Sequence, residues 1–262
     1  MAKENQQPIT GCGQGEIAPY VFLCGDPERV PRISDGWEGL EEVCRIREYV
    51  LHTGTCQGVR MTVGSTGIGG PSTAVLFEEL AKLGAHTFIR VGNSGALADH
   101  VNLGEYVVTT GCLRDDGTSK SYVRPEYPAV AHFEVVQALA HAGAGQDTPV
   151  HTGVTWSLDA FYARNKVANS EGPLISMSHR GYEQSWMNDL VWDAKKAGVL
   201  NVEMESSTVL TLAGLFGVRG GCICTVSDRT PWPGPGQDSI DLDKNMAGAI
   251  QIATRAMLAL AG

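Results

Sequence analysis

Short runs of consecutive apolar residues recur along the chain, and several of them end in turns that carry glycine. Such runs, bounded by turns, are typical of strands that are buried on both faces. We therefore predict strands at residues 20–24, 60–64, 87–91, 106–110 and 221–226. Between them, apolar residues that share one helical face predict helices at residues 72–83, 133–142 and 205–216.

Strands that alternate with helices predict an α/β fold. We expect a three-layer αβα sandwich, in which a central, mixed and twisted sheet is covered by helices on both faces. The sequence has no internal repeat and no long linker, which favours a single domain over residues 18–262. Residues 1–17 are polar and without periodicity, and we expect a flexible arm there. Residues 163–197 form a polar excursion that is either a lid over a substrate or an inert surface insertion.

Composition narrows the class of partner. Of the 262 residues, 43% are hydrophobic, which excludes a disordered chain. The net charge of −9 gives no indication of a basic surface that would bind nucleic acid or an anionic membrane. Because the sequence shows neither a membrane-spanning apolar stretch nor a signal-peptide pattern, we expect a cytoplasmic protein with a small-molecule partner. Seven scattered cysteines without a C-x-x-C pair predict buried, reduced thiols rather than disulfides or a zinc site.

Two of the predicted strands lead into glycine turns with an arginine nearby. Residues 25–29, Gly-Asp-Pro-Glu-Arg, follow the first strand, and Arg90 lies at the end of the third. Glycine lets backbone N–H groups approach an oxyanion, and a guanidinium binds phosphate through two donors. Arg29, Arg90 and Arg47 together predict a phosphate pocket, although a turn with a surface arginine is the commoner alternative for residues 25–29 alone. The glycine-rich turn at residues 65–72 either offers further amides or is only structural.

Two acidic segments follow later strands. In Glu203-Met204-Glu205, a carboxylate is suited to accept hydrogen bonds from neighbouring sugar hydroxyls, and methionine can lie beneath the apolar face of a sugar. An acidic first turn of a helix is the alternative. Asp228, if it is desolvated, could hold a proton for a leaving group, with Arg229 tuning its pKa. A surface ion pair is the alternative here.

Taken together and in this order, these segments resemble the nucleoside phosphorylase family and, most closely, its uridine phosphorylase branch. The resemblance spans about residues 20 to 260 and rests on several motifs rather than on one. The matching segments are Gly25-Asp26-Pro27-x-Arg29, residues 65–72, Arg90-x-Gly92-x-x-Gly95, residues 126–133 and Val202-Glu203-Met204-Glu205-Ser206.

The resemblance implies an α/β sandwich that assembles as dimers, commonly three to a hexamer, and cleaves a nucleoside with inorganic phosphate into a base and a pentose 1-phosphate. It implies no organic cofactor. For phosphate it implies Gly25, Arg29, Arg90 and, from the neighbouring subunit, Arg47. Asn93 and Ser94 are also candidates for phosphate: Asn93 replaces a hydroxyl residue of the family in this turn, and we expect Ser94 to take over that contact. For ribose it implies Glu203, Met204 and Glu205, and for a potassium ion between subunits it implies Glu48, Ile68 and Ser72. For the base it implies Ser94, Gly95, Phe161, Asn165 and Asp228, with Asp228, Arg229 and Arg90 as the catalytic residues.

Two departures from the uridine pattern concern the base. The uridine branch has a glutamine and an arginine that bind the edge of uracil, where this chain has Asn165 and Val167. The segment around Asp228 resembles that of the purine nucleoside phosphorylases, whose aspartate protonates N7 of the purine. We therefore favour purine nucleosides, with Asp228 as the general acid. Uridine phosphorolysis with a rearranged base loop is the second hypothesis.

Two further classes are alternatives. A nucleoside hydrolase would use water in place of phosphate, but related hydrolases lack the phosphate turn that residues 25–29 supply. A non-catalytic nucleoside-binding protein is expected to have lost arginines or carboxylates of the motifs, and Arg29, Arg90, Glu205 and Asp228 are all present.

Overall fold

A ten-stranded mixed sheet forms the centre of the computed structural model, which describes residues 6–169, 172–233 and 245–262. The strands lie in the order β11-β8-β6-β12-β5-β1-β4-β3-β2, and β7 pairs with β6. Their bounds are β1 Tyr20–Cys24, β2 Glu38–Ile46, β3 Tyr49–Cys56, β4 Val59–Ser65, β5 Thr87–Ala96, β6 Tyr106–Asp115, β7 Ala129–Val130, β8 Val150–Leu158, β11 Asn201–Glu203 and β12 Arg219–Arg229.

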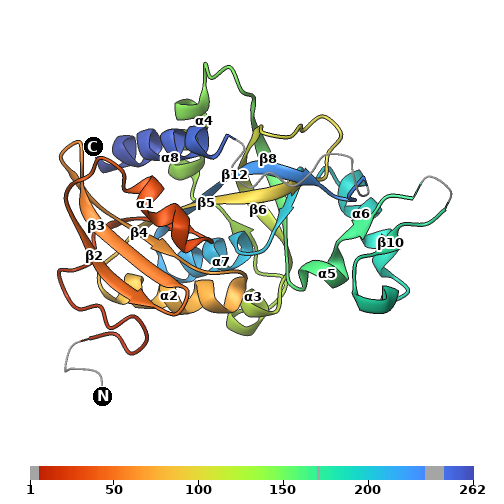
Figure 1. Cartoon of the computed structure of the whole chain (residues 1–262), viewed down its shortest axis with the longest axis horizontal. Helices are drawn as coiled ribbons and strands as arrows, with labels where there is room; N and C mark the ends of the chain where they lie inside the picture. Colours follow the sequence, from red (N-terminus) through yellow and green to blue (C-terminus); the bar gives the residue numbers. More distant parts are fainter. Residues whose placement is uncertain (1–5, 170–171, 234–244) are drawn as a thin grey trace.

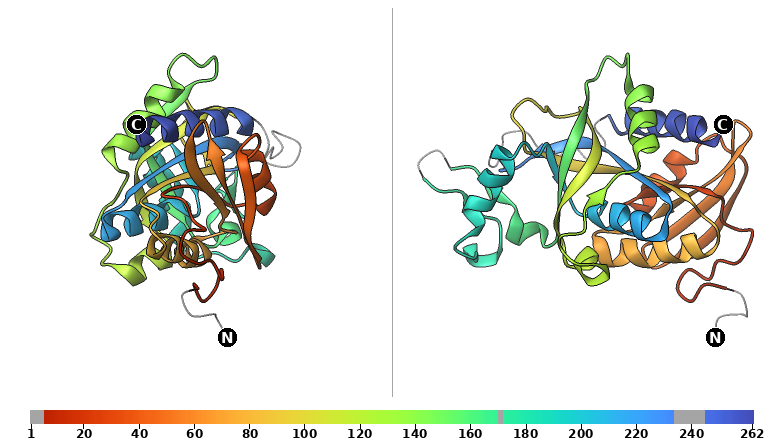
Figure 2. Two further views of the ribbon diagram at one scale, coloured as in Figure 1. Left: turned by 90° about the vertical axis from the view of Figure 1, so that its left-hand side faces the viewer. Right: turned by 180° about the vertical axis from the view of Figure 1, so that it is seen from behind.

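Helices cover both faces of this sheet, as Figures 1 and 2 show. One face carries α2 (Gly70–Lys82), α3 (Gly117–Tyr122) and α7 (Ser206–Phe216), and the other carries α1 (Val30–Ile33), α4 (Phe133–Gly143) and α8 (Met246–Ala261). Separate apolar clusters fill the two interfaces, one built on α2 and α7 and the other on α4 and α8. The predicted three-layer αβα class is confirmed.

The parallel strands β4, β1, β5 and β12 end at the same edge of the sheet. Leu23 of β1 lies beside Arg90 of β5, and Asp228 of β12 lies beside Gly95. A β-bulge between Val226 and Asp228 shifts the register of β12 at this edge. Bulges of this kind re-aim side chains, and the carboxyl ends of strands are where open α/β sheets bind ligands.

The apolar pattern located eight elements and missed others. All five predicted strands and all three predicted helices are present, with ends that differ by at most five residues. The pattern gave no prediction for β2, β3, β8 or α8. All seven cysteines are free thiols, and five of them are buried.

The N-terminal segment departs from the expected flexible arm. Within its described residues, the backbone N–H groups of Ile9 and Thr10 donate to the Glu79 carboxylate on α2, at 2.9 and 2.8 Å. Cys12 is fully buried in the core cluster that α2 and α7 form. Residues 6–17 are therefore packed against the domain, because a buried carboxylate anchors their backbone.

The polar excursion at residues 163–197 lies at one end of the molecule, to the right in Figure 1. Its elements are the end of α5 (Phe161–Arg164), the paired strands β9 (Lys166–Val167) and β10 (Ile175–Ser176), a 3-10 turn η2 (His179–Gly181) and α6 (Met187–Lys196). The side chain of Lys166 is fully buried and pairs with Glu183. Within the described ranges, no helix has both the length and the apolar character that crossing a membrane requires.

Candidate active site

Arg90 is a buried cation on β5 that is held by two carboxylates. Its Nε donates to Glu203 Oε2 at 3.0 Å, and its Nη2 pairs with Glu205. Burial alone would lower the pKa of Arg90, but Glu205 and Glu203 more than offset this and the pKa is raised. The guanidinium lies against Gly92, where an added Cβ would come within 2.7 Å of Nη2. Residue 92 is therefore restricted to glycine by the course of this side chain.

The two glutamates meet Arg90 at the N-terminus of α7. Glu203 accepts the backbone N–H groups of Glu205, at 2.8 Å, and of Ser206, at 2.9 Å, so it caps the helix as well as pairing with Arg90. Glu205 accepts the backbone N–H of Gly69 at 2.6 Å. Burial raises the pKa of Glu205, although Arg90 opposes the shift. Glu203 was expected to contact ribose, whereas both of its oxygens are engaged with the helix and the arginine.

Arg29 brings a second buried cation to the same edge of the sheet. It ends the 3-10 turn η1 (Pro27–Arg29), and its Nη1 and Nη2 donate to the Val91 carbonyl at 3.3 Å and to Asn93 Oδ1 at 2.6 Å. Burial lowers its pKa, and the positive charge of Arg90 adds to this effect. Among the described residues, Arg29 Nε and Arg90 Nη1 are buried donors without a hydrogen-bond partner. Two neighbouring cations with spare donors have the chemistry that suits binding of an anion.

The turns around these arginines are joined by backbone hydrogen bonds. Thr66 N–H donates to the Cys24 carbonyl at 2.7 Å, and Gly67 N–H donates to Gly25 at 2.9 Å. These bonds hold the turn after β1 against the glycine-rich turn before α2. Burial raises the pKa of the Cys24 thiol to about 12, so this cysteine is not a thiolate nucleophile at neutral pH.

Asp228 stands at the bulge of β12, beside Gly95. Its Oδ1 accepts from Ser227 Oγ at 3.0 Å and its Oδ2 accepts from the Trp232 indole N–H at 2.7 Å. Burial raises the pKa of Asp228, and the two hydrogen bonds oppose the shift. Arg229 was expected to tune this pKa, but its Nη2 donates instead to Asn102 Oδ1 at 3.2 Å. Successive residues of a strand face opposite sides, which separates the two side chains.

The segment after α5 meets the turn after β12. Asn165 Oδ1 accepts from Thr230 Oγ1 at 3.2 Å, and the Phe161 ring packs edge-on against Trp232 with 6.3 Å between centroids. The backbone of Trp232 donates to the Lys166 carbonyl at 2.8 Å and accepts from Ala168 N–H at 2.5 Å. Phe161 and Asp228 thus both contact Trp232, and Asn165 contacts the neighbouring Thr230. Trp232 was missed, although a tryptophan four residues after a candidate acid was a usable signal.

Ser94 and Asn93, both predicted to bind phosphate, make hydrogen bonds within the chain at the end of β5. Asn93 Oδ1 is bound by Arg29, so this residue holds the arginine. Ser94 Oγ accepts from Asn201 Nδ2 at 2.9 Å and is buried. Both side chains therefore support the turn at the end of β5.

The residues implied for a potassium ion lie together around Gly67. A Cβ built on Gly67 would come within 2.9 Å of Glu48 Cγ and 3.6 Å of Ser72 Oγ, and Ser72 Oγ donates to the Ile68 carbonyl at 3.4 Å. A carboxylate, a hydroxyl and a carbonyl are oxygen donors of the kind that hold hard cations. Arg47, next to Glu48, is exposed at the tip of the β2–β3 hairpin, where its φ is 54°.

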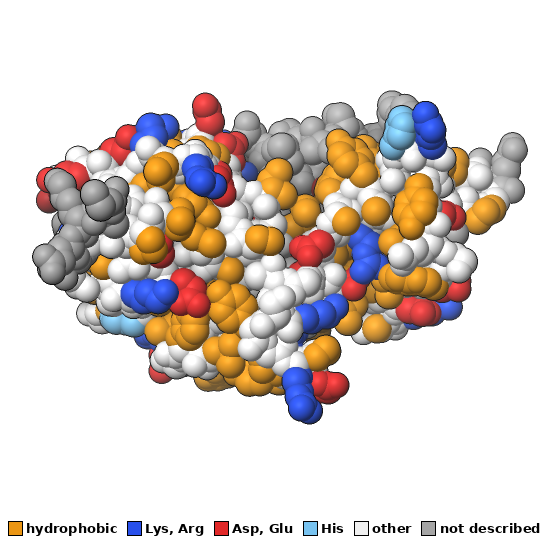
Figure 3. All heavy atoms as spheres, turned by 90° about the horizontal axis from the view of Figure 1, so that it is seen from below, with side chains coloured by type: hydrophobic (Ala, Val, Ile, Leu, Met, Phe, Trp, Pro, Cys, Tyr) orange, Lys and Arg blue, Asp and Glu red, His pale blue; other side chains and the backbone are white. Residues whose placement is uncertain are grey.

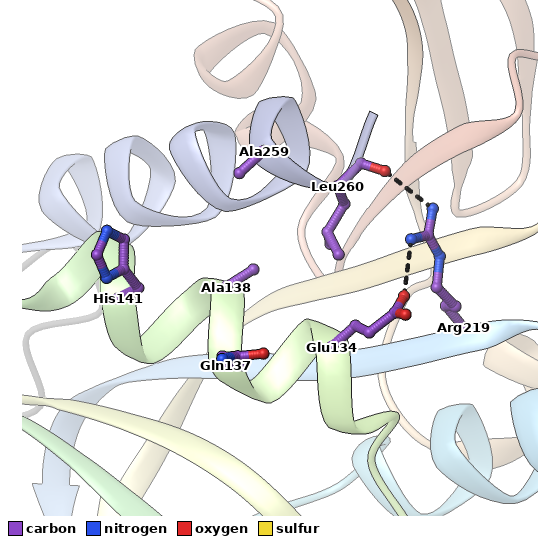
Figure 4. A pocket seen from close by; sticks show the side chains of 7 residues that line it. All are labelled: Glu134, Gln137, Ala138, His141, Arg219, Ala259 and Leu260. Atoms are coloured by element: carbon purple, nitrogen blue, oxygen red, sulfur yellow. Dashed lines mark hydrogen bonds and ion pairs between the residues drawn. The ribbon is translucent and has the colours of Figure 1, made fainter. Parts of the chain in front are cut away.

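A cavity of about 360 Å³ between α4 and α8 lies elsewhere in the molecule (Figure 4). The two charged side chains that line it pair with each other, Arg219 with Glu134 at 3.1 Å. Arg219 also donates a hydrogen bond to the Leu260 carbonyl at 3.2 Å. None of the residues that line it belongs to the candidate site.

The known proteins that this chain resembles in sequence and structure are phosphorylases. The family model described as "Phosphorylase superfamily" matches residues 19–261. The chain is 46% identical to a uridine phosphorylase of Thermococcus kodakarensis, over 86% of this chain and 78% of that protein. It is 35% identical to a guanosine phosphorylase of Halorubrum lacusprofundi, over 97% of this chain and 99% of that protein. It also superposes on the crystal structure of a uridine phosphorylase from Vibrio fischeri with a TM-score of 0.81 and 31% identity, covering 98% and 97% of the two chains.

Proposed function

The chain belongs to the phosphorylase superfamily, and from this premise we propose that it is a nucleoside phosphorylase that acts on purine nucleosides. It would cleave the N-glycosidic bond with inorganic phosphate and release the base and a pentose 1-phosphate. Phosphate is a co-substrate, and the reaction needs no organic cofactor.

The observation that carries this proposal is the pair of buried arginines with spare donors. Arg29 and Arg90 repel one another, and each keeps a buried N–H without a partner among the described residues. A phosphate dianion would neutralise the repulsion and accept both hydrogen bonds, aided by the backbone of the Gly25 turn. The same dianion would be the nucleophile, held in place before the bond breaks.

The carboxylate of Glu205 is placed for the ribose. Glu205 is buried next to Arg90, and Met204 beside it is partly exposed. We assign the ribose hydroxyls to Glu205 and the apolar face of the sugar to Met204. As the glycosidic bond stretches, the ribose gains positive charge, which the phosphate and Glu205 would stabilise electrostatically. Glu203 would act through Arg90 by fixing its orientation.

For the base, Asp228 supports a purine. A departing purine gains negative charge, and a carboxyl group whose pKa is raised by burial is suited to donate a proton to it. Phe161 and Asn165 would line the base pocket. Uridine remains the second candidate, because most of the relatives found are uridine phosphorylases, including those of Thermococcus kodakarensis and Haemophilus influenzae.

We also propose a homodimer with a shared active site, three copies of which would form a hexamer. Arg47 is exposed on a hairpin tip, from which it can enter the phosphate site of a second copy. The face that α2 and α3 form carries gathered apolar side chains (Figure 3), and Ile68, Val75 and Tyr122 are 80%, 36% and 40% exposed. Glu48, Ser72 and the Ile68 carbonyl would hold a potassium ion there, which would supply positive charge between the subunits.

One assay tests the reaction and the base together. Base release is measured on inosine, guanosine, adenosine, uridine and thymidine, each with and without inorganic phosphate. Phosphate-dependent release of purines is the expected result. Release of uracil instead would overturn the purine assignment, and release without phosphate would show a hydrolase. No release from any nucleoside would favour a binding protein.

A further inference from the structure

We propose that Trp232 is a positioning residue for Asp228. Its indole directs the acidic proton to Oδ1 and links the orientation of the carboxyl group to residues 161–168, which we call the base loop. The inference rests on the proposed function, because it gives the acid of that reaction its orientation. It starts from the indole N–H of Trp232, which lies 2.7 Å from Asp228 Oδ2.

An indole N–H can donate a hydrogen bond but cannot accept one. The lone pair of Oδ2 that faces Trp232 is therefore always an acceptor, whichever protonation state Asp228 adopts. Gly95 lies next to this oxygen, since the position that a Cβ would take on Gly95 is 3.3 Å from Oδ2. A proton that Asp228 carries for donation is thus directed to Oδ1.

Ser227 suits this arrangement because its hydroxyl has two acceptors. Ser227 Oγ lies 3.0 Å from Asp228 Oδ1 and 3.4 Å from the Ser94 carbonyl. A hydroxyl can donate and accept at once. When Asp228 is ionised, Ser227 donates to Oδ1; when Oδ1 is protonated, Ser227 turns its hydrogen to the Ser94 carbonyl. Neither state leaves the serine hydroxyl without an acceptor.

Trp232 also connects the acid to the base loop. Its backbone makes hydrogen bonds with Lys166 and Ala168, and its ring contacts Phe161. Movement of residues 161–168 would therefore move the indole and change the direction of the Asp228 carboxyl group. A base that fits the loop and a correctly aimed acid are then coupled through one side chain.

The charged groups on the surrounding elements are already engaged. Arg229, next to Asp228 on β12, donates to Asn102. Arg90 on β5 pairs with Glu203 and Glu205, and Lys166 on β9 pairs with Glu183. The hydrogen bond from the indole favours the charged form of Asp228, as the one from Ser227 does, so its loss is expected to raise the pKa of Asp228.

The test is Trp232→Phe, which removes the N–H but keeps an aromatic ring against Phe161. We expect kcat for inosine or guanosine to fall about 10-fold, with the KM for phosphate unchanged. Asp228 acts in its protonated form, so activity is lost as pH rises through its pKa; a raised pKa moves the alkaline limb of the kcat profile to higher pH. Trp192→Phe, at an exposed tryptophan of α6, is the matched control. A fall in kcat without a shifted limb, or wild-type kinetics, would overturn the proposal.

A second measurement does not depend on the substrate. The chain has five tryptophans, and the indole N–H signal of Trp232 in a ¹H–¹⁵N spectrum is the one that Trp232→Phe removes. We expect that signal to move with pH in the wild type and to stay fixed in Asp228→Asn. A signal that ignores pH in the wild type would refute the hydrogen bond even if purines are cleaved. A signal that titrates in a protein without purine activity would instead refute the proposed function and leave the contact established.

Discussion

The candidate site has two ends: an arginine end (Arg29, Arg90, Glu203 and Glu205) and a base end (Phe161, Asn165, Asp228 and Trp232). The two ends balance buried charge in different ways. Arg90 is paired with two carboxylates, Glu203 and Glu205, which also bind backbone N–H groups at the start of α7 and in the turn before α2. Asp228 has no such counter-charge among the described residues: its hydrogen-bond donors there are Ser227 and Trp232, both neutral.

The two ends also differ in what fixes their residues. The arginine end is built on β5, β11 and the N-terminus of a buried helix, so the sheet determines where its groups lie. The base end draws on α5, β9 and the turn after β12, all at or beyond the edge of the sheet. This difference suggests that the arginine end serves every substrate, whereas the base end selects among bases. Substitutions at the two ends should separate these effects.

The largest loss is expected at Arg90. Arg90→Met leaves Glu203 and Glu205 buried without their cation, which costs about 3–5 kcal/mol of the free energy of unfolding. It also removes a donor to phosphate, and we expect kcat/KM to fall by about 10³-fold or more for every nucleoside. Thermal unfolding and phosphate-dependent base release measure the two effects.

Arg29→Met separates binding from stability at the same end. Its hydrogen-bond partners in the described chain are the Val91 carbonyl and the Asn93 amide, so its removal leaves no carboxylate unpaired. The KM for phosphate should rise without a fall in Tm. Arg45→Met, in an exposed pair with Glu42, is the matched control and should change neither quantity. A loss confined to one base would contradict the role given to the arginine end.

At the base end, Asp228→Asn should discriminate between bases. The amide keeps the shape of the carboxyl group but cannot donate an acidic proton. We expect phosphorolysis of inosine and guanosine to fall by about 10²-fold, with the KM for phosphate unchanged and the alkaline limb of the pH profile lost. Asp99→Asn, at an exposed carboxylate, is the control. Equal rates for wild type and Asp228→Asn would remove Asp228 from the mechanism.

A smaller effect is expected at Arg47, where the arginine end would be completed by a second copy of the chain. Arg47→Ala should raise the KM for phosphate about 10-fold with little change in Tm, because the side chain is exposed in the single chain. Arg45→Ala, two residues away on the same hairpin, is the matched control. Full activity of a monomer in dilute solution would rule out a shared site.

The sequence predicted the arginine end better than the base end, for a physical reason. The motifs around Arg29, Arg90 and Glu205 follow buried strands. The continuous apolar run of such a strand predicts both its position and the residue at which it ends. β2 is exposed over most of its length and offers no such run, so it was missed. Even at the arginine end, the capping role of Glu203 depended on where α7 begins.

The base end depends on contacts between distant segments and on one irregularity. The pairing of Trp232 with Lys166 joins residues that no periodicity relates. The bulge before Asp228 changes which side chains of β12 face the site. Because a bulge leaves no clear mark in the apolar pattern, the register that places Asp228 beside Gly95 could not be predicted.

The smallest expected effect is on the Tm of Asp228→Asn. This measurement tests directly whether the buried charge of Asp228 lacks a counter-charge. Burial raises the pKa of Asp228 in the folded state, so its contribution to stability is present at low pH and is lost as pH rises through that pKa. Asp228→Asn does not ionise, and its amide oxygen can still accept from Trp232. The Tm of the variant should therefore exceed that of the wild type by about 1–3 °C at pH 8, with a smaller difference at pH 4.5. Glu205, whose pKa is also raised by burial, is present in both proteins, so its effect cancels in the comparison. A difference in Tm that is the same at both pH values, or that grows towards low pH, would show that Asp228 has a counter-charge after all.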